Sequence, residues 1–139
     1  MTRQRSLDLD CPKCATRQPV ALYDSINVSL EPGLREKLLN GEINSFRCEK
    51  CGERAFIPVP LLYHDMNKAF MVQFYPFEGA QHREFLAQFT KDGEIAAVDG
   101  LPRKIREGFK RIQIVFDMGE LIRYVIFRER LYELWKDAS

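Results

Sequence analysis

Cys11-Pro12-Lys13-Cys14 and Cys48-Glu49-Lys50-Cys51-Gly52 form two C-x2-C pairs, with 33 residues between them. A C-x2-C turn places two thiols on the same side of a tight loop, and structural zinc takes four such ligands in a tetrahedral shell. Gly52 suits the turn because glycine tolerates a positive φ, and Ala15 holds the equivalent place after the first pair. We therefore expect one structural zinc ion per chain, bound in a zinc-ribbon-like centre by Cys11, Cys14, Cys48 and Cys51.

Disulfides and unrelated buried thiols are the alternative interpretations of the four cysteines. The start of the chain has no apolar stretch typical of a signal peptide, and no window is apolar enough to span a membrane. We therefore expect a cytoplasmic protein, in which thiols stay reduced and metal binding is favoured over disulfides. A shell of four thiolates leaves no open position for substrate, so the zinc is expected to be structural and not catalytic.

Composition bounds the remaining possibilities. The 139 residues are 45% hydrophobic and 29% charged, which predicts a folded core and excludes a disordered tail or a coiled-coil rod. The formal net charge is only +1, so the chain as a whole has no strong attraction to nucleic acid or to an anionic membrane. We expect a single α+β domain over residues 1–139, with a four-cysteine part at 1–75 and an α/β extension at 76–139.

Hydrophobic periodicity predicts a β-rich first half with one inserted helix. Apolar residues alternate over residues 20–30, which indicates a half-buried strand. Leu34, Leu38 and Leu39 share one face of a short helix that ends at Asn40-Gly41. The spacing between the cysteine pairs exceeds the roughly 15 to 20 residues of compact ribbons, and this strand and helix account for the excess. Further strands are predicted at residues 43–47 and 55–59, and a hairpin at 61–63 and 69–75 around a loop at 64–68.

The second half is predicted to contain a long terminal helix. Asp117 and Glu120 have the spacing of a capping box, and the helix they open would run toward Trp135. Upstream of this helix, residues 112–116 are expected to form a strand and residues 102–110 a basic helix. Residues 81–89 fit a helix slightly better than a strand.

The motifs together resemble the CpXC-motif proteins, a bacterial and archaeal family of small domains. The resemblance is carried by Cys11 to Cys14, Ile26-Asn27-Val28, Pro32, Leu39-Asn40-Gly41, Asn44, Cys48 to Gly52, and Pro60-Leu61-Leu62-Tyr63-His64-Asp65. It covers most of the chain and is densest from Cys11 to about Phe74. It implies a zinc-ribbon-like domain whose four metal ligands are the four cysteines, and it implies no catalytic residue.

Three further segments are candidate sites. Tyr63, His64 and Asp65 would offer acid–base groups, but neighbours on a strand point to opposite faces, so a turn with a packed Tyr63 is the preferred interpretation. A basic segment at residues 103–111 offers a nucleic-acid contact, although a solvated helix face explains it better. The residues that would make this contact are Arg103, Lys104, Arg106, Lys110 and Arg111.

Apolar residues surround the axis of the terminal helix between residues 121 and 127. Two interpretations stay open: a helix enclosed in the core, or a helix whose spare face forms a homodimer. The interface residues would be Leu121, Ile122, Val125 and Ile126. The leading functional hypothesis is a non-enzymatic, zinc-stabilised binding or assembly module, and the alternatives are a redox- or zinc-responsive thiol switch and a nucleic-acid-binding zinc ribbon.

Overall fold

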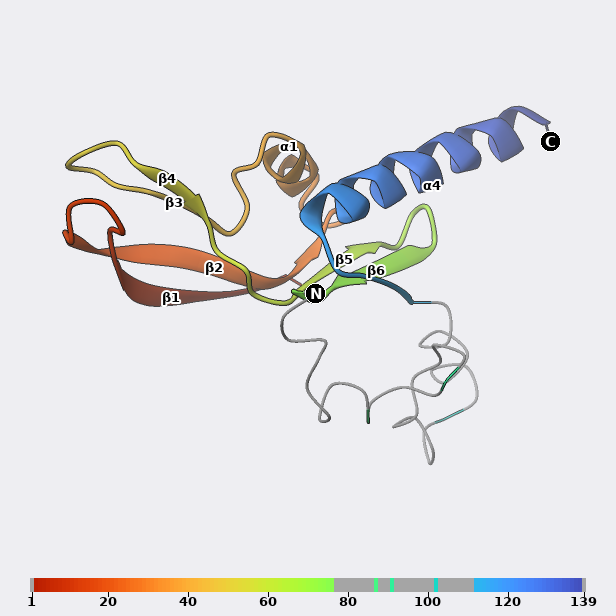
Figure 1. The fold of residues 1–139 in the computed structure, drawn as a ribbon. Helices are drawn as coiled ribbons and strands as arrows, with labels where there is room; N and C mark the ends of the chain where they lie inside the picture. The colour runs from red at the N-terminus through yellow and green to blue at the C-terminus, as the bar shows by residue number, and fades with distance from the viewer. Residues whose placement is uncertain (1, 77–86, 88–90, 92–101, 103–111, 139) are drawn as a thin grey trace.

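The computed structural model describes residues 2–76 and 112–138, together with Ala87, Lys91 and Pro102 (Figure 1). The described part is an α+β fold, as predicted, with a β-rich first half, a small helix and a long terminal helix. In chain order the elements are β1 Arg3–Asp10, β2 Arg17–Asn27, α1 Gly33–Leu39, β3 Ser45–Arg47, β4 Arg54–Phe56, β5 Leu61–Asp65, β6 Phe70–Phe74, β7 Gln113–Val115 and α4 Met118–Ala138. Apart from Ala87 and Pro102, the predicted elements at residues 81–89 and 102–110 lie outside the described residues.

A five-stranded sheet in the order β1-β2-β5-β6-β7 forms the frame of the described part. The β1–β2 and β5–β6 pairs are antiparallel, whereas β2–β5 and β6–β7 are parallel. Parallel neighbours need a long crossover, and the crossover from β2 to β5 contains α1 and the separate β3–β4 hairpin. The long spacing between the two cysteine pairs is explained by β2, α1 and β3, which all lie between them.

The first strand, β1, was not predicted from the sequence. Nearly all of its residues are exposed, so it lacks the apolar alternation that marks a half-buried strand. It is held instead by an eight-residue antiparallel pairing with β2, and its charged side chains suit an edge strand.

The strand β2 begins and ends three residues earlier than the predicted strand at 20–30. The side-chain oxygen of buried Asn27 accepts hydrogen bonds from the backbone amides of Ser29 and Leu30, at 3.1 and 3.3 Å, and turns the chain. This local turn stops the strand before its apolar pattern ends.

A buried asparagine joins the inserted hairpin to the sheet. Asn44, with φ of 53°, accepts a 2.7 Å hydrogen bond from the Tyr23 backbone amide and donates a 3.0 Å bond to the Tyr23 carbonyl. Its own carbonyl accepts a 2.8 Å bond from the amide of Ile57 just beyond β4. One residue thus anchors the base of the β3–β4 hairpin to β2.

The predicted hairpin is present as β5 and β6, but the predicted loop at 64–68 is wrong. His64 and Asp65 belong to β5 and pair with β6, and the turn lies at residues 66–69. Asp65 is buried, and its carboxylate accepts a 3.0 Å bond from the Lys68 backbone amide. Asp65, the last residue of β5, therefore stabilises the turn that follows it.

The terminal helix α4 begins as predicted. The Asp117 carboxylate accepts hydrogen bonds from the amides of Gly119 and Glu120, at 2.7 and 3.2 Å, and the Glu120 side chain accepts one from the Phe116 amide. These bonds satisfy amides that a helix start leaves without partners. The helix packs on β6 and β7, and its C-terminal half extends past the strands (Figure 1).

The main core of the described residues lies between the sheet and helices α1 and α4. Its fully buried members include Ile26, Leu38, Leu61, Val72 and Leu121. A bidentate ion pair joins the helices at its edge, because Arg35 of α1 donates to both carboxylate oxygens of Glu129 of α4 at 2.6 and 2.9 Å. Within the described ranges, no helix has both the length and the apolar character needed to cross a membrane.

Candidate metal centre

The two cysteine pairs occupy the ends of two hairpins. Cys11 and Cys14 lie in the turn between β1 and β2, and Cys48 and Cys51 lie in the turn between β3 and β4. Figure 1 places both turns at the same end of the molecule, away from the C-terminus. The topology therefore brings together two short motifs that are distant in sequence.

Both turns have the same backbone hydrogen bonds. The amide of Cys11 donates to the Thr16 carbonyl and the amide of Ala15 donates to the Cys11 carbonyl, each at 2.9 Å. In the second turn, Cys48 donates to Glu53 at 2.8 Å and Gly52 donates to Cys48 at 2.9 Å. The repeated pattern makes the two turns equivalent knuckles.

The residue after each pair has a left-handed backbone. Ala15 has φ of 62° and Gly52 has φ of 77°, and L side chains are disfavoured in this region. The prediction that Ala15 and Gly52 hold equivalent places in the two turns is therefore confirmed. Ala15 has backbone strain at this place, and Gly52 avoids it.

Backbone amides also point at the sulfurs. Cys11 Sγ accepts bonds from the amides of Lys13 and Cys14, both at 3.4 Å, and Cys48 Sγ accepts one from the Cys51 amide at 3.5 Å. The first cysteine of each knuckle is therefore held in place by backbone amides of its own turn.

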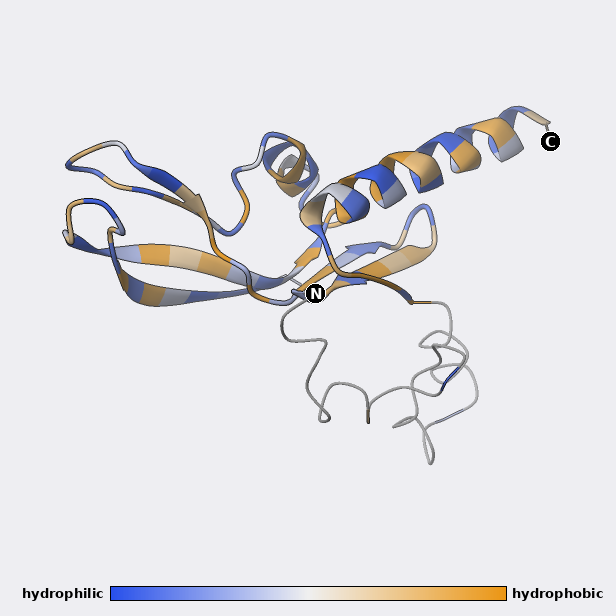
Figure 2. Cartoon of the chain, in the orientation of Figure 1, coloured by the Kyte–Doolittle hydropathy of each residue, from blue (hydrophilic) through white to orange (hydrophobic). Residues whose placement is uncertain are grey.

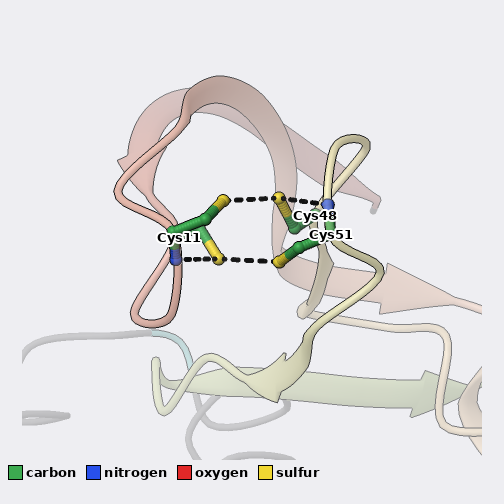
Figure 3. Close-up of side chains that lie close together, drawn as sticks. Cys11, Cys48 and Cys51 are labelled. Atoms are coloured by element: carbon green, nitrogen blue, oxygen red, sulfur yellow. Dashed lines mark hydrogen bonds between the residues drawn. The ribbon is translucent and has the colours of Figure 1, made fainter.

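The four sulfurs form one cluster (Figure 3). Cys11 and Cys51 have their Sγ atoms 3.5 Å apart, as do Cys14 and Cys48, and all four Sγ atoms lie within 4.8 Å of one another. Zinc–sulfur bonds of about 2.3 Å in a tetrahedron require sulfurs about 3.8 Å apart. The observed separations bracket this value and none of the four cysteines is in a disulfide, so the donor set fits a single tetrahedral metal ion.

The surroundings of the sulfurs favour charge on two of them. Hydrogen bonds from the Thr16 hydroxyl and backbone lower the pKa of Cys14 to about 6, and the Cys51 amide lowers the pKa of Cys48. For Cys51, the Glu53 amide acts in the same direction, but desolvation and the three neighbouring sulfurs outweigh it and raise its pKa to about 12. Without a cation the crowded sulfurs oppose full ionisation, and a bound divalent ion removes that conflict.

A small second core lies beneath the cluster. Cys11 and Cys48 are buried in it with Val20, Leu22 and Phe46, whereas Cys14 is half-buried and Cys51 is exposed. One sulfur of each pair therefore faces the protein interior and the other faces the rim.

The polar residues that support the knuckles were not predicted. Gln18 bridges the hairpins, because its amide donates to the Arg47 carbonyl at 2.8 Å and its oxygen accepts from the Glu49 amide at 2.9 Å. Thr16 places its hydroxyl 3.1 Å from Cys14 Sγ. No sequence periodicity predicts these contacts. The signal that could have indicated them is that Thr16 and Gln18 lie two and four residues after the first cysteine pair.

The structure does not bring the side chains of the predicted Tyr63-His64-Asp65 site together. Tyr63 and Asp65 face the core and half-buried His64 faces the other side of β5, as the alternation rule predicted, and burial lowers the pKa of His64. The basic residues at 103–111 lie outside the described part of the chain.

The terminal helix presents only some of its predicted interface residues. Leu121 and Val125 are fully buried in the main core and Ile122 packs against it. These three side chains therefore fit the enclosed-helix interpretation. Ile126 lies half-buried on the outer side.

Comparison with curated proteins and with solved structures finds no match to this chain. Comparison with family models finds one described as CpXC protein, over residues 9–136. The matched segment begins just before the first cysteine pair and ends near the end of α4, so it spans both knuckles, α1 and most of α4. The chain belongs to the CpXC protein family.

Proposed function

We propose that the four cysteines hold one structural zinc ion and that the chain is a non-enzymatic module whose assembly surface is the outer face of α4. The arrangement of the four sulfurs carries the first part of this proposal. Tetrahedral sites of four cysteine sulfurs are typical of zinc and of iron–sulfur chemistry, and zinc fits a site whose ligands leave no open position. When bound, zinc supplies a crosslink between the two hairpins.

The energetic need for this crosslink follows from the small size of the second core. Val20, Leu22 and Phe46 each contribute about 1.5–3 kcal/mol when buried. Zinc binding in peptides with structural sites contributes about 10–16 kcal/mol. The metal is therefore expected to be the dominant interaction at this end of the molecule, and its loss is expected to free the tips of the two hairpins from each other while the base of the β3–β4 hairpin and the main core persist.

The outer face of α4 supports the assembly role. Ile126, Phe127, Leu131 and Leu134 recur at helical spacing along one side and line a single hollow with Arg123 and Arg130. Phe127 is 56% exposed and Leu134 is 68% exposed, and Figure 2 shows apolar residues continuing along the part of α4 that extends past the sheet. An apolar stripe with a polar border is typical of a protein-binding surface.

A second copy of this chain is the partner that we propose. Arg123 and Arg130 line the hollow, and Glu133 and Asp137 lie beside Arg130 toward the C-terminal end of the stripe. In an antiparallel pair of α4 helices, Arg123 of one copy would lie near Glu133 and Asp137 of the other while the apolar residues pack between them.

Sedimentation velocity on the full chain tests the assembly role. The double variant Phe127→Glu/Leu134→Glu is expected to sediment as a monomer where the parent forms a dimer. The control Gln4→Glu/Asn67→Glu adds the same charge at exposed positions on β1 and in the β5–β6 turn, and should leave the dimer intact. A parent that stays monomeric at concentrations up to about 100 µM would contradict the proposal, because the dissociation constant of a stable homodimer lies well below that concentration.

A further inference from the structure

A groove of about 590 Å³ separates the β3–β4 hairpin from the ends of α1 and α4. Its walls come from the end of α1 and the turn after it, from both hairpin strands, and from the first turns of α4. Small-molecule sites typically enclose about 300–1,000 Å³, so the groove is large enough for one. Its lining includes Phe46 and Ala55, which also contact the second core, and it shares no residue with the hollow on the outer face of α4.

The inner part of the groove is apolar. Leu38 and Ile43 line it from the α1 side, Met118 and Ile122 from α4, and Phe56 from β4. Phe56 meets the ring of Phe74 at a centroid distance of 6.0 Å, yet 45% of its surface remains exposed. A large aromatic side chain left half-uncovered beside a hollow favours an apolar occupant.

The outer part of the groove carries two arginines. Arg47 and Arg54 face each other directly across the β3–β4 pair and both line the groove. Like charges at directly opposite positions repel each other. None of the ion pairs among the described residues includes either side chain, and Glu42, the acidic residue of the lining, lies on the opposite wall after α1.

We propose that this groove binds a small organic acid with an apolar body, the carboxylate lying between Arg47 and Arg54. Guanidinium groups bind carboxylates through paired hydrogen bonds and are weakly hydrated for cations. An anion between them replaces their mutual repulsion with two attractions. The apolar body then covers Phe56 and fills the space toward Met118, so both halves of the groove are satisfied by one molecule.

Two fluorescent probes that differ in one charged group test the proposal. Anilinonaphthalene sulfonate has an aromatic body with an anionic group, and N-phenylnaphthylamine has the same body without it. The sulfonate is expected to bind the metal-loaded parent at least tenfold more tightly than the neutral probe. Decanoate should displace it, whereas decanol at the same concentration should not.

Variants locate the binding. Arg47→Gln/Arg54→Gln is expected to weaken sulfonate binding at least tenfold and to change binding of the neutral probe less than twofold. Arg3→Gln/Arg17→Gln removes the same charge from exposed positions on β1 and β2 and should change neither. Arg54→Gln alone, which leaves the residue next to Cys48 unaltered, should weaken sulfonate binding at least threefold, so the test survives if the double variant fails to fold. Sulfonate binding that is unchanged in Arg54→Gln, or that is lost in Phe127→Glu/Leu134→Glu instead, would overturn the proposal.

Discussion

Cys14 and Cys48 lie 34 residues apart in the chain, yet their Sγ atoms are 3.5 Å apart. Each belongs to a different hairpin, and the hairpins are joined at their bases by Asn44, whose side chain pairs with the Tyr23 backbone. Asn44 at the base of the β3–β4 hairpin and the sulfur cluster at its tip therefore both anchor this hairpin to the sheet, with Gln18 bridging the hairpins near the tip. The account predicts that the tip anchor depends on a metal and the base anchor does not.

Reciprocal substitutions should expose the strain in the first knuckle. Ala15→Gly is expected to stabilise the metal-loaded protein by about 1 kcal/mol and Gly52→Ala to destabilise it by about 1 kcal/mol, because both positions have positive φ. A Cβ at Gly52 would meet no atom within 4 Å, so the cost there is backbone conformation alone. Gly33→Ala, also free of contacts but at negative φ, is the control and should be neutral or stabilising. Urea denaturation measures all three, and effects of the same sign at positions 15 and 52 would contradict this explanation.

The ion pair between Arg35 and Glu129 should couple α1 to α4. Glu129 is largely buried, with 14% of its side chain exposed, whereas 35% of Arg35 is exposed. Solvent screening at Arg35 limits the coupling energy, which we expect to be about 1 kcal/mol in a double-mutant cycle of Arg35→Leu and Glu129→Gln. Glu36→Gln removes the more exposed partner of the same arginine and should cost less than about 0.5 kcal/mol. If the effects of Arg35→Leu and Glu129→Gln on the free energy of unfolding were strictly additive, the ion pair would contribute nothing to stability.

The hydroxyl of Tyr63 should be dispensable. The residue is fully buried and its ring stacks on Phe70 at 5.8 Å, but the hydroxyl has no hydrogen-bond partner among the described residues. Burial also raises the pKa of this phenol. Tyr63→Phe keeps the ring and removes an unsatisfied polar group, so we expect the free energy of unfolding to rise by about 1 kcal/mol. Thermal or urea unfolding would contradict this if the phenylalanine variant were less stable than the parent.

Oxidation should release the proposed zinc slowly. Two of the four cysteines are buried, and buried structural cysteines react with oxidants far more slowly than exposed thiols of low pKa. In modest hydrogen peroxide, zinc release followed with a chromogenic chelator is expected to keep pace with global unfolding. Exposed Cys51 is the point at which this expectation is most vulnerable. Rapid release that a thiol reductant reverses would instead support a thiol switch.

The elements that sequence reasoning located are those with local signals. The two C-x2-C turns, the Asp117 cap and the two apolar runs of the β5–β6 hairpin each depend on residues within a few positions of one another, and each is present in the structure. The long spacing between the pairs also indicated correctly that other elements lie between them.

The misplaced elements depend on partners distant in sequence. The exposed edge strand β1 exists because β2 offers it a long hydrogen-bonding edge, which no pattern in residues 3–10 reveals. Similarly, Leu121 and Val125 face inward because β6 and β7 lie beneath α4. An all-round apolar helix shows that one side must be buried, but tertiary packing decides which.

Elemental analysis of the purified chain tests the central claim most directly. Protein prepared under reducing, chelator-free conditions should contain one zinc per chain, and Cys48→Ser should lose it. Lys50→Ser changes an exposed residue of the same knuckle and should keep it. A reduced, folded parent with substoichiometric zinc, or with iron and its visible absorption in place of zinc, would contradict the account.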